Sequence, residues 1–354
     1  MKCLRFLLLL LVLLESPFAA WGVILFGTGD PSAHTTAPEG ELARSGWEFQ
    51  TGPFGSGTIV GPAEVLTAAH LGWAANLSIT WGGLSFPIVA AVDRAGTDLR
   101  LLRVSGHFPS WAESYAGTNE VGATVVLYGR GGPRGGAIMA PEGQRVQGWR
   151  WNVPDNQLRW GTNVIEMVVS PSEENPGEHL AAVFSNDAGD DEATVSSGDS
   201  GGGVFLRDTD GRWKLAGVMS SVQGAFKIRP EEKTPFFAAI FDRRGLLEEQ
   251  SPGVWLPDPT AETSPGTVWL ATRVAAYSHW LAGELSQATV IPGPRLKSSA
   301  NLAGPFHEHP AYSLNANTRR ITAIPGGDQE FFQLEGEPTI RTLRRVEGKI
   351  ELEY

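Results

Sequence analysis

One serine of the chain stands in surroundings that suit nucleophilic chemistry. The stretch TVSSGDSGGGVF, residues 194–205, places Ser200 between an acid and a run of glycines. A serine hydroxyl is a weak nucleophile until a neighbouring base takes its proton. A reactive Ser200 therefore needs a histidine that the fold brings to it, and the chain offers seven histidines.

His70 has the most distinctive setting of the seven. It ends the run GTIVGPAEVLTAAH, a β-type apolar segment that closes in two alanines, which suits a tight turn with the ring pointing into a cleft. Downstream, in VDRAGTDLRLLRV, Asp98 opens a second apolar run. A carboxylate placed there can hold an imidazole in one tautomer and stabilise its protonated form. Asp93 is an alternative acid, ahead of the turn RAGT.

Several segments together resemble a known family. LTAAH, DLRLLRV and GDSGGGVF follow one another in the order His, Asp, Ser, and WKLAGVMSSV and GTVWLATRVAAYSHWL come after them. Over about residues 46–286 the chain thereby resembles the chymotrypsin-like (trypsin-like) serine proteases. The resemblance implies an all-β fold of two six-stranded antiparallel β-barrels with a C-terminal helix. It also implies a triad of His70, Asp98 and Ser200 between the barrels.

The same resemblance implies the chemistry of a serine endopeptidase. Ser200 would attack a peptide carbonyl to form a covalent acyl-enzyme, with His70 as general base and then general acid. The N–H groups of Gly198 and Ser200 would form the oxyanion hole. No cofactor and no metal is implied. Because only a neutral imidazole accepts the proton, the rate should rise with pH.

The resemblance also assigns a substrate pocket. Thr194, six residues before the nucleophile, falls at its base, and Ser220, Ser221 and Val222 would line its wall and pair with the substrate backbone. Because Thr194 carries no charge and Val222 narrows the pocket, we expect a preference for small or medium apolar side chains. Two acidic residues shortly before Thr194 would work against this preference.

Other interpretations of these residues stay open. The segment 198–202 also fits the G-x-S-x-G elbow of α/β-hydrolases, which needs a helix directly after the serine, whereas a glycine-rich and β-type run follows here. The chain is alternatively a catalytically inert protease homologue that acts as a binding module. His307 and His309 lack an obvious third metal ligand, so we expect them in a loop.

Length and composition set limits on the class of protein. The 354 residues suffice for two domains, and 43 glycines with 24 prolines favour short strands and turns over long helices. A net charge of −11 argues against nucleic acid or an anionic membrane surface as partner. The expected partner is a protein or peptide substrate, and no oligomeric state is indicated.

The first twenty residues have the pattern of a secretory signal peptide. Two basic residues precede the apolar run from Phe6 to Leu14, and Ala19 and Ala20 follow. The run is short for a membrane span, although an uncleaved anchor is the alternative. We therefore expect a secreted or periplasmic protein. The single cysteine, Cys3, lies in this segment, so the mature chain would lack disulfides, which favours a bacterial member of the family.

The rest of the chain divides by composition. Short β-type runs continue to about residue 285, and the pattern RVAAYSHWLAGEL predicts a helix at their end. Two prolines then mark a linker. The predicted divisions are a signal peptide (1–20), a protease domain (21–286, with barrels at about 46–118 and 119–275), a linker (287–294) and a small β-rich module (295–354). Residues 223–265 read as an insertion, either a lid, a specificity loop or an inert excursion.

The activating step has three alternatives. Many members of the family pair a newly formed N-terminal ammonium with the acid before the nucleophile, here Asp199. The new terminus would be Trp21 after signal removal or would follow a cut after Arg44. In the third alternative an internal arginine pairs with Asp199 and no cleavage is required.

Overall fold

The computed structural model describes residues 23–53, 56–140, 143–153, 155–263, 266–287, 293–336 and 339–354. The expected signal peptide, its cysteine and Trp21 lie outside the described residues. Within the described ranges strands dominate, and the one α-helix is α1 (Ser278–Leu285). Short 3-10 helices occur at η1 (Gly40–Leu42), η2 (Trp47–Phe49), η3 (Ala69–Leu71), η4 (Pro259–Glu262) and η5 (Ala275–Tyr277).

The first part of the chain forms a five-stranded antiparallel sheet. Its order is β2 (Thr58–Gly61), β3 (Glu64–Ala68), β6 (Leu99–Val104), β5 (Leu84–Asp93) and β4 (Ser78–Trp81). The sequence LRLLRV explains β6, since its leucines and valine are buried while its two arginines reach partly into solvent. Burying this apolar face supplies the core of the first half of the domain.

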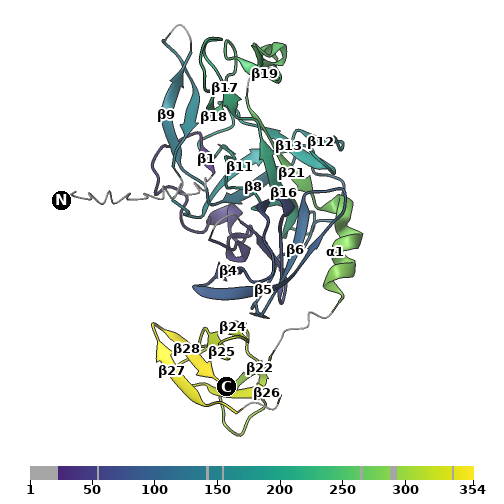
Figure 1. The fold of residues 1–354 in the computed structure, drawn as a ribbon, viewed down its shortest axis with the longest axis vertical. Helices are drawn as coiled ribbons and strands as arrows, with labels where there is room; N and C mark the ends of the chain where they lie inside the picture. Colours follow the sequence, from purple (N-terminus) through teal and green to yellow (C-terminus); the bar gives the residue numbers. More distant parts are fainter. Residues whose placement is uncertain are drawn as a thin grey trace, which may run out of the picture.

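The second half forms a seven-stranded antiparallel sheet. Its order is β11 (Arg159–Val164), β8 (Thr124–Gly129), β15 (Gly203–Arg207), β16 (Trp213–Val222), β21 (Val268–Arg273), β13 (His179–Val183) and β12 (Met167–Val169). Helix α1 follows β21 and lies beside β6 (Figure 1), where Glu284 pairs with Arg103 at 2.9 Å. The predicted all-β fold of two antiparallel halves with a C-terminal helix is confirmed, and its strands are divided five and seven between the two sheets where six and six were expected.

Residues of the insertion build an extension above this domain. β17 (Ala225–Phe226) and β18 (Phe236–Ile240) join β10 (Val146–Trp151) and β9 (Arg134–Met139) in a four-stranded sheet, and β19 (Glu248–Ser251) pairs with β20 (Val254–Leu256). These strands stand together at the top of Figure 1. A buried guanidinium, that of Arg243, ties the insertion together through ion pairs to Glu248 at 2.6 Å and Asp258 at 3.0 Å.

The C-terminal residues form two further sheets. One contains β22 (Arg295–Ser299), β23 (His307–Glu308) and β26 (Phe331–Glu335), and the other contains β24 (Tyr312–Asn315), β25 (Arg320–Ala323), β27 (Thr342–Val346) and β28 (Lys349–Glu353). The second sheet continues into β7 (Gly106–His107), because β24 pairs with it antiparallel. The module at the bottom of Figure 1 is thus joined to the first half of the domain by main-chain pairing as well as by the chain.

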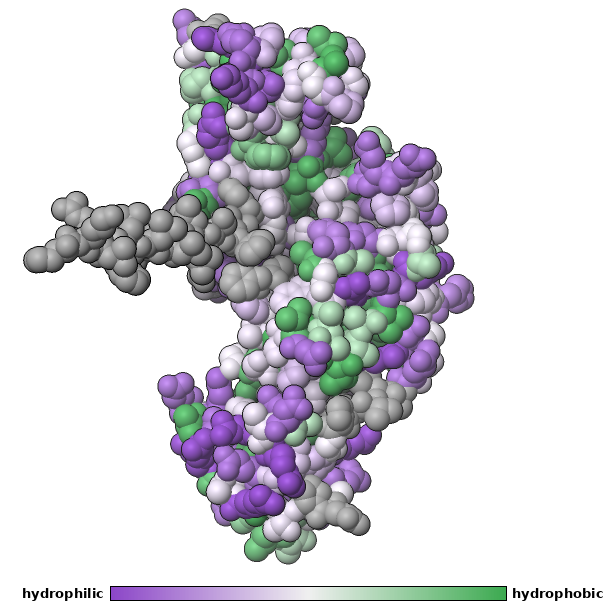
Figure 2. Space-filling view, in the orientation of Figure 1, coloured by the Kyte–Doolittle hydropathy of each residue, from purple (hydrophilic) through white to green (hydrophobic). Residues whose placement is uncertain are grey.

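The surface carries no single large apolar area on the side shown in Figure 2. Hydrophobic residues (green) lie in small groups among hydrophilic ones, and one group lies just below the upper extension. None of the helices in the described ranges has the length and apolar character needed to cross a membrane. Scattered exposed apolar side chains of this kind are normal for a folded domain.

Candidate active site

The pairing of β3 with β6 brings the candidate base and its acid together. Ala68 lies opposite Leu99 in this antiparallel pair, so the next residue of one strand faces the preceding residue of the other. The N–H of Ala69 accordingly donates to the carbonyl of Asp98 at 2.8 Å. His70 follows in the short helix η3, which turns the chain away from the sheet at this point.

The Asp98 carboxylate holds His70 at two points. The ring nitrogen Nδ1 lies 2.6 Å from Asp98 Oδ2, and the backbone N–H of His70 donates to Oδ1 at 2.9 Å. A carboxylate accepts at Nδ1, so the ring carries its proton there and Nε2 is left as the acceptor. The acid is well covered, with 14% of its side chain exposed, whereas 45% of the imidazole is exposed.

Asp93, the alternative acid, is engaged elsewhere. Its two carboxylate oxygens accept from Nε and Nη2 of Arg100 at 2.6 and 2.8 Å. This hydrogen bonding holds the pKa of Asp93 below its usual value. The pairing with Arg100 points this carboxylate away from His70, so the structure brings Asp98 and not Asp93 to the imidazole.

Ser200 lies on a glycine-rich loop packed against the end of β3. Its carbonyl accepts from the N–H of Ser56 at 3.1 Å. The next residue, Gly201, has φ +82°, and a Cβ atom there would lie 2.1 Å from the Ser56 carbonyl oxygen and 2.4 Å from Oγ1 of Thr67. Only glycine fits this close approach. The loop therefore contacts the end of β3 at Thr67, three residues before His70.

The structure thus packs the Ser200 loop against the end of β3, directly before the His70–Asp98 pair. Within the described ranges, no hydrogen bond joins the Ser200 hydroxyl to the His70 ring. Nucleophile–base hydrogen bonds are often long without substrate and tighten when it binds.

Two backbone donors of the nucleophile loop are available to a ligand. Two other N–H groups of this loop are already bonded: that of Asp199 donates to the carbonyl of Ser196 at 3.2 Å, and that of Gly201 donates to the carbonyl of Met219 at 2.8 Å. Among the described residues, no acceptor contacts the N–H of Gly198 or of Ser200. Gly198 has φ +93°, a conformation that glycine adopts without strain. Two such free N–H groups can stabilise an oxygen that gains negative charge during a reaction.

Asp199 itself is fully buried beneath this loop. Its carboxylate accepts from the N–H groups of Ser196 at 2.8 Å and Gly131 at 3.2 Å. Burial raises its pKa well above the usual value, opposed in part by those hydrogen bonds and by the positive charge of Arg159. Arg159 is the arginine whose charge acts on Asp199. Its guanidinium donates to Asp155 and to the carbonyl of Pro31, so these hydrogen bonds go to partners other than Asp199.

A hollow of about 250 Å³ opens beside Ser200. Its lining contains three of the predicted pocket residues, Ser220, Ser221 and Val222, whereas the fourth, Thr194, is fully buried in β14 (Ala193–Thr194), which pairs with β1 (Ile24–Leu25). The complete lining is Trp151, Val195, Ser196, Ser197, Ser200, Met219, Ser220, Ser221 and Val222. No charged side chain belongs to it.

The hydroxyl groups on the wall of this hollow already have acceptors. Ser220 Oγ donates to the carbonyl of Leu270 at 3.2 Å, and Ser221 Oγ donates to Oδ1 of Asn175 at 3.0 Å. The acids that precede Thr194 do not line the hollow, and Asp191 lies 3.3 Å from His34 Nε2. The hollow therefore presents a neutral surface to a side chain.

Sequence reasoning missed some of these lining residues. Ser196 and Ser197 lie in the segment directly before the nucleophile, so their position next to the motif could have predicted them. Trp151 carried no such signal, because it lies in the hairpin β9–β10 and reaches the hollow only through the folding of the extension.

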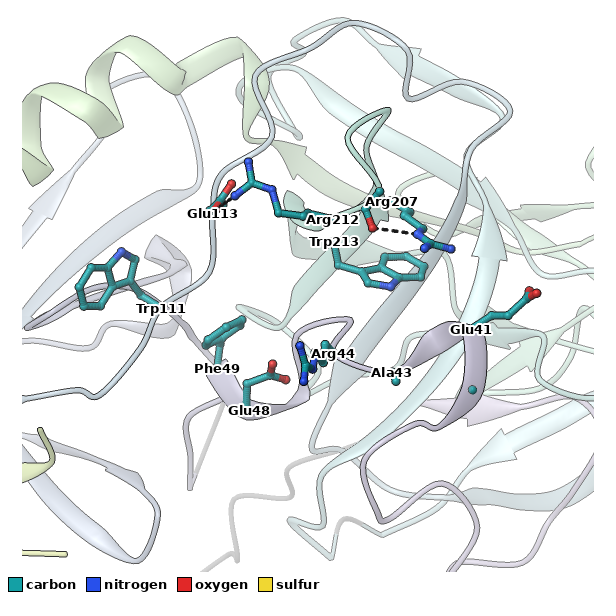
Figure 3. Close-up of a pocket in the computed structure, with 12 residues that line it drawn as sticks. Glu41, Ala43, Arg44, Glu48, Phe49, Trp111, Glu113, Arg207, Arg212 and Trp213 are labelled. Atoms are coloured by element: carbon teal, nitrogen blue, oxygen red, sulfur yellow. Dashed lines mark hydrogen bonds and ion pairs between the residues drawn. The ribbon is translucent and has the colours of Figure 1, made fainter. Parts of the chain in front are cut away.

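A larger hollow of about 800 Å³ lies elsewhere and contains none of the predicted site residues. Figure 3 shows aromatic side chains there, including Trp111 and Trp213, among three arginines and three glutamates. It offers neither a histidine nor a candidate nucleophile. The larger volume of this hollow therefore does not coincide with residues that could catalyse a reaction.

Possible metal ligands are dispersed. In the part of the chain that the structure describes, no group of three His, Cys, Asp or Glu side chains is placed to hold an ion. His307 lies in β23, and His309 is buried in the C-terminal module with Nε2 3.4 Å from Glu330.

Comparisons with known proteins give a distant likeness. No protein-family model and no curated protein sequence matches the chain. Among solved structures it is similar to neuropsin, a serine protease expressed in the limbic system of mouse brain, with 16% identity and a TM-score of 0.42 over 70% of this chain and 98% of that one. It is also similar to an inactive form of Rv3671c from M. tuberculosis, with 16% identity and a TM-score of 0.37 over 68% and 88% of the two chains. At this distance the likeness adds nothing to the geometry of the site.

Proposed function

We propose that the chain is a secreted serine endopeptidase that cleaves peptide bonds through His70, Asp98 and Ser200. The observation that carries this proposal is the double hold of the Asp98 carboxylate on the ring and the backbone of His70. A carboxylate in this position fixes the tautomer in which Nε2 accepts a proton. The secretory part of the proposal rests on the N-terminal sequence alone.

The reaction follows from the positions of these groups. Nε2 of His70 takes the hydroxyl proton of Ser200 as Oγ attacks the carbonyl carbon of the scissile bond. The N–H groups of Gly198 and Ser200 stabilise the negative oxygen of the tetrahedral intermediate. The imidazolium, stabilised by Asp98, then protonates the leaving amine, and water releases the acyl group by the same steps in reverse.

The neutral hollow beside Ser200 supports the choice of substrate side chain. Its lining of serines, valines, a methionine and Trp151 offers no partner for a lysine or an arginine. A charged side chain would lose its hydration there without compensation. Peptides with a small or medium apolar residue before the cleaved bond are therefore the proposed substrates.

A peptide library digested by purified protein tests the proposal, with the Ser200→Ala variant run in parallel. Products that appear with the wild type and vanish with the variant, mapped by mass spectrometry, support an endopeptidase. Products from neither protein favour the inert binding homologue. Efficient cleavage after arginine would refute the assigned pocket while leaving the triad in place.

A further inference from the structure

One residue, Trp151, lines two hollows at once. Its first hollow is the one of about 250 Å³ that contains Ser200. The second, of about 420 Å³, is lined by Arg150, Trp151, Glu232, Thr234, Pro235, Phe236 and Phe237. Both hollows therefore share the indole as a wall, and a peptide bound at Ser200 has the second hollow within a few residues' reach.

The extension holds the indole firmly in this place. Arg150 lies opposite Ala238 in the pairing of β10 with β18, which fixes the strand end that carries Trp151. The indole stacks on the ring of Phe237 with centroids 5.2 Å apart and planes at 30°. Gly224 also lies close to it, since a Cβ atom there would come within 2.5 Å of the indole. The wall is thus built by residues of the insertion.

The second hollow has an aromatic floor and an open rim. Phe237 is 51% exposed although it is a large apolar side chain. Of the two charged residues of the hollow, Arg150 places its guanidinium 4.5 Å over the ring of Phe236, which belongs to the same lining, and Glu232 accepts from the N–H of Ile228 at 3.1 Å. The exposed ring of Phe237 and the indole stacked on it form the aromatic part of the hollow, which suits another large apolar side chain.

A free strand edge leads from Ser200 to this hollow. β16 pairs with β15 only as far as Val218, while its pairing with β21 continues to Val222. Within the described ranges, no strand covers the second edge of residues 220–222. An extended peptide can add to such an edge through its main chain. When it runs antiparallel, its residues N-terminal to the cleaved bond follow β16 toward Gly224 and the Trp151–Phe237 pair.

We propose that Trp151 and Phe237 form a second substrate subsite, which takes a large apolar and preferably aromatic side chain two to four residues before the cleaved bond. This proposal rests on the proposed function and names the substrate class of the same site. Trp151 serves both subsites, whereas Phe237 belongs to the second alone.

Phe237→Ala tests the proposal, because this exposed ring can be removed without opening the core. Peptides with one fixed residue before the cleaved bond would carry Phe, Leu, Gly or Lys at each of the three preceding positions. For the wild type we expect kcat/KM to be about tenfold higher with Phe than with Gly at one of them, as a stacked aromatic contact predicts. In Phe237→Ala this ratio should fall to about one.

Met139→Ala is the matched control, since Met139 is an exposed apolar side chain on β9 of the same sheet and lines neither hollow. It should keep the wild-type ratio. Labelling of Ser200 by a small fluorophosphonate separates the two proposals. Normal labelling with no aromatic preference, or with a preference that survives Phe237→Ala, overturns the subsite alone. No labelling of the folded wild type overturns the proposed function and the subsite with it.

Discussion

Ser200 has neighbouring regions on two sides, and these are held in different ways. On one side, His70 and Asp98 are neighbours because two adjacent strands of one sheet pair in register, and hydrogen bonds of 2.6 and 2.9 Å lock them. On the other side, Trp151 is held by stacking and close packing against residues of the insertion, which begins more than seventy residues later in the chain. The first side suits the catalytic step, which needs fixed geometry. The second side suits the choice of substrate, because substitutions in the insertion can alter the packing of Trp151 without disturbing the triad.

Removal of the nucleophile should have the largest effect. Ser200→Ala leaves His70 without a hydroxyl to activate, so kcat should fall by about 10⁶-fold. Peptide hydrolysis by the purified variant measures this loss. Retained activity would mean that another group is the nucleophile and that His70 and Asp98 have no special role in the reaction.

Asp98→Asn compared with Asp93→Asn examines the choice between the two acids. An amide in place of the Asp98 carboxylate favours the wrong tautomer of His70, so kcat should fall by about 10⁴-fold. Asp93 contacts Arg100 and not the imidazole, so its variant should keep wild-type activity. Equal losses in the two variants would contradict the assignment of the acid.

A buried acid, Glu192, should make the stability of the fold depend on pH. Burial, with help from Asp187 and Glu166, raises the pKa of Glu192 to about 8. Because the folded value exceeds the unfolded one, the folded state prefers the protonated acid. Its contribution is complete below the unfolded value of 4.5 and is lost as the pH rises to about 8.

Glu192→Gln should remove this loss. The variant should match the wild type at pH 4 and exceed its free energy of unfolding by about 4 kcal/mol at pH 8. Denaturant unfolding at both pH values gives the comparison, with the exposed Glu173→Gln as control. A variant that is less stable than the wild type at pH 8 would show that the charged form is the one the fold stabilises.

Gly224→Ala should have the smallest effect and acts on the packed side alone. The added methyl group lies within 2.6 Å of two indole carbons, so Trp151 must move. We expect kcat/KM to change by about tenfold for substrates with larger residues before the cleaved bond, while labelling of Ser200 stays normal. Gly136→Ala on β9, where a Cβ atom meets nothing within 4 Å, is the control and should leave both unchanged.

The two sides also differ in how far the sequence predicts them. The motifs around His70, Asp98 and Ser200 name these residues because each lies at a strand end or in a glycine-dependent turn, where local sequence determines the backbone. Counting back from Ser200 led to Thr194, but the pairing of β14 with β1 buries that residue, and Val195 and Ser196 line the hollow.

Pairings between distant segments explain what the sequence did not predict. Nothing in the residues around Trp151 indicates that residues 236–240 pair with its strand. The small β module after the linker was predicted, whereas the pairing of Tyr312 with His107 in the first half of the domain was not. Main-chain pairing of this kind depends on which edges are free in the folded domain and not on a local pattern.

Labelling of the purified protein with a serine-reactive fluorophosphonate tests the central claim most directly. Mass-spectrometric mapping would locate the adduct, with Ser200→Ala and Asp98→Asn beside the wild type. An adduct on Ser200 in the wild type, absent from Ser200→Ala and much slower in Asp98→Asn, is the predicted result. A folded wild type that gains no adduct, before and after limited proteolysis, would contradict the account.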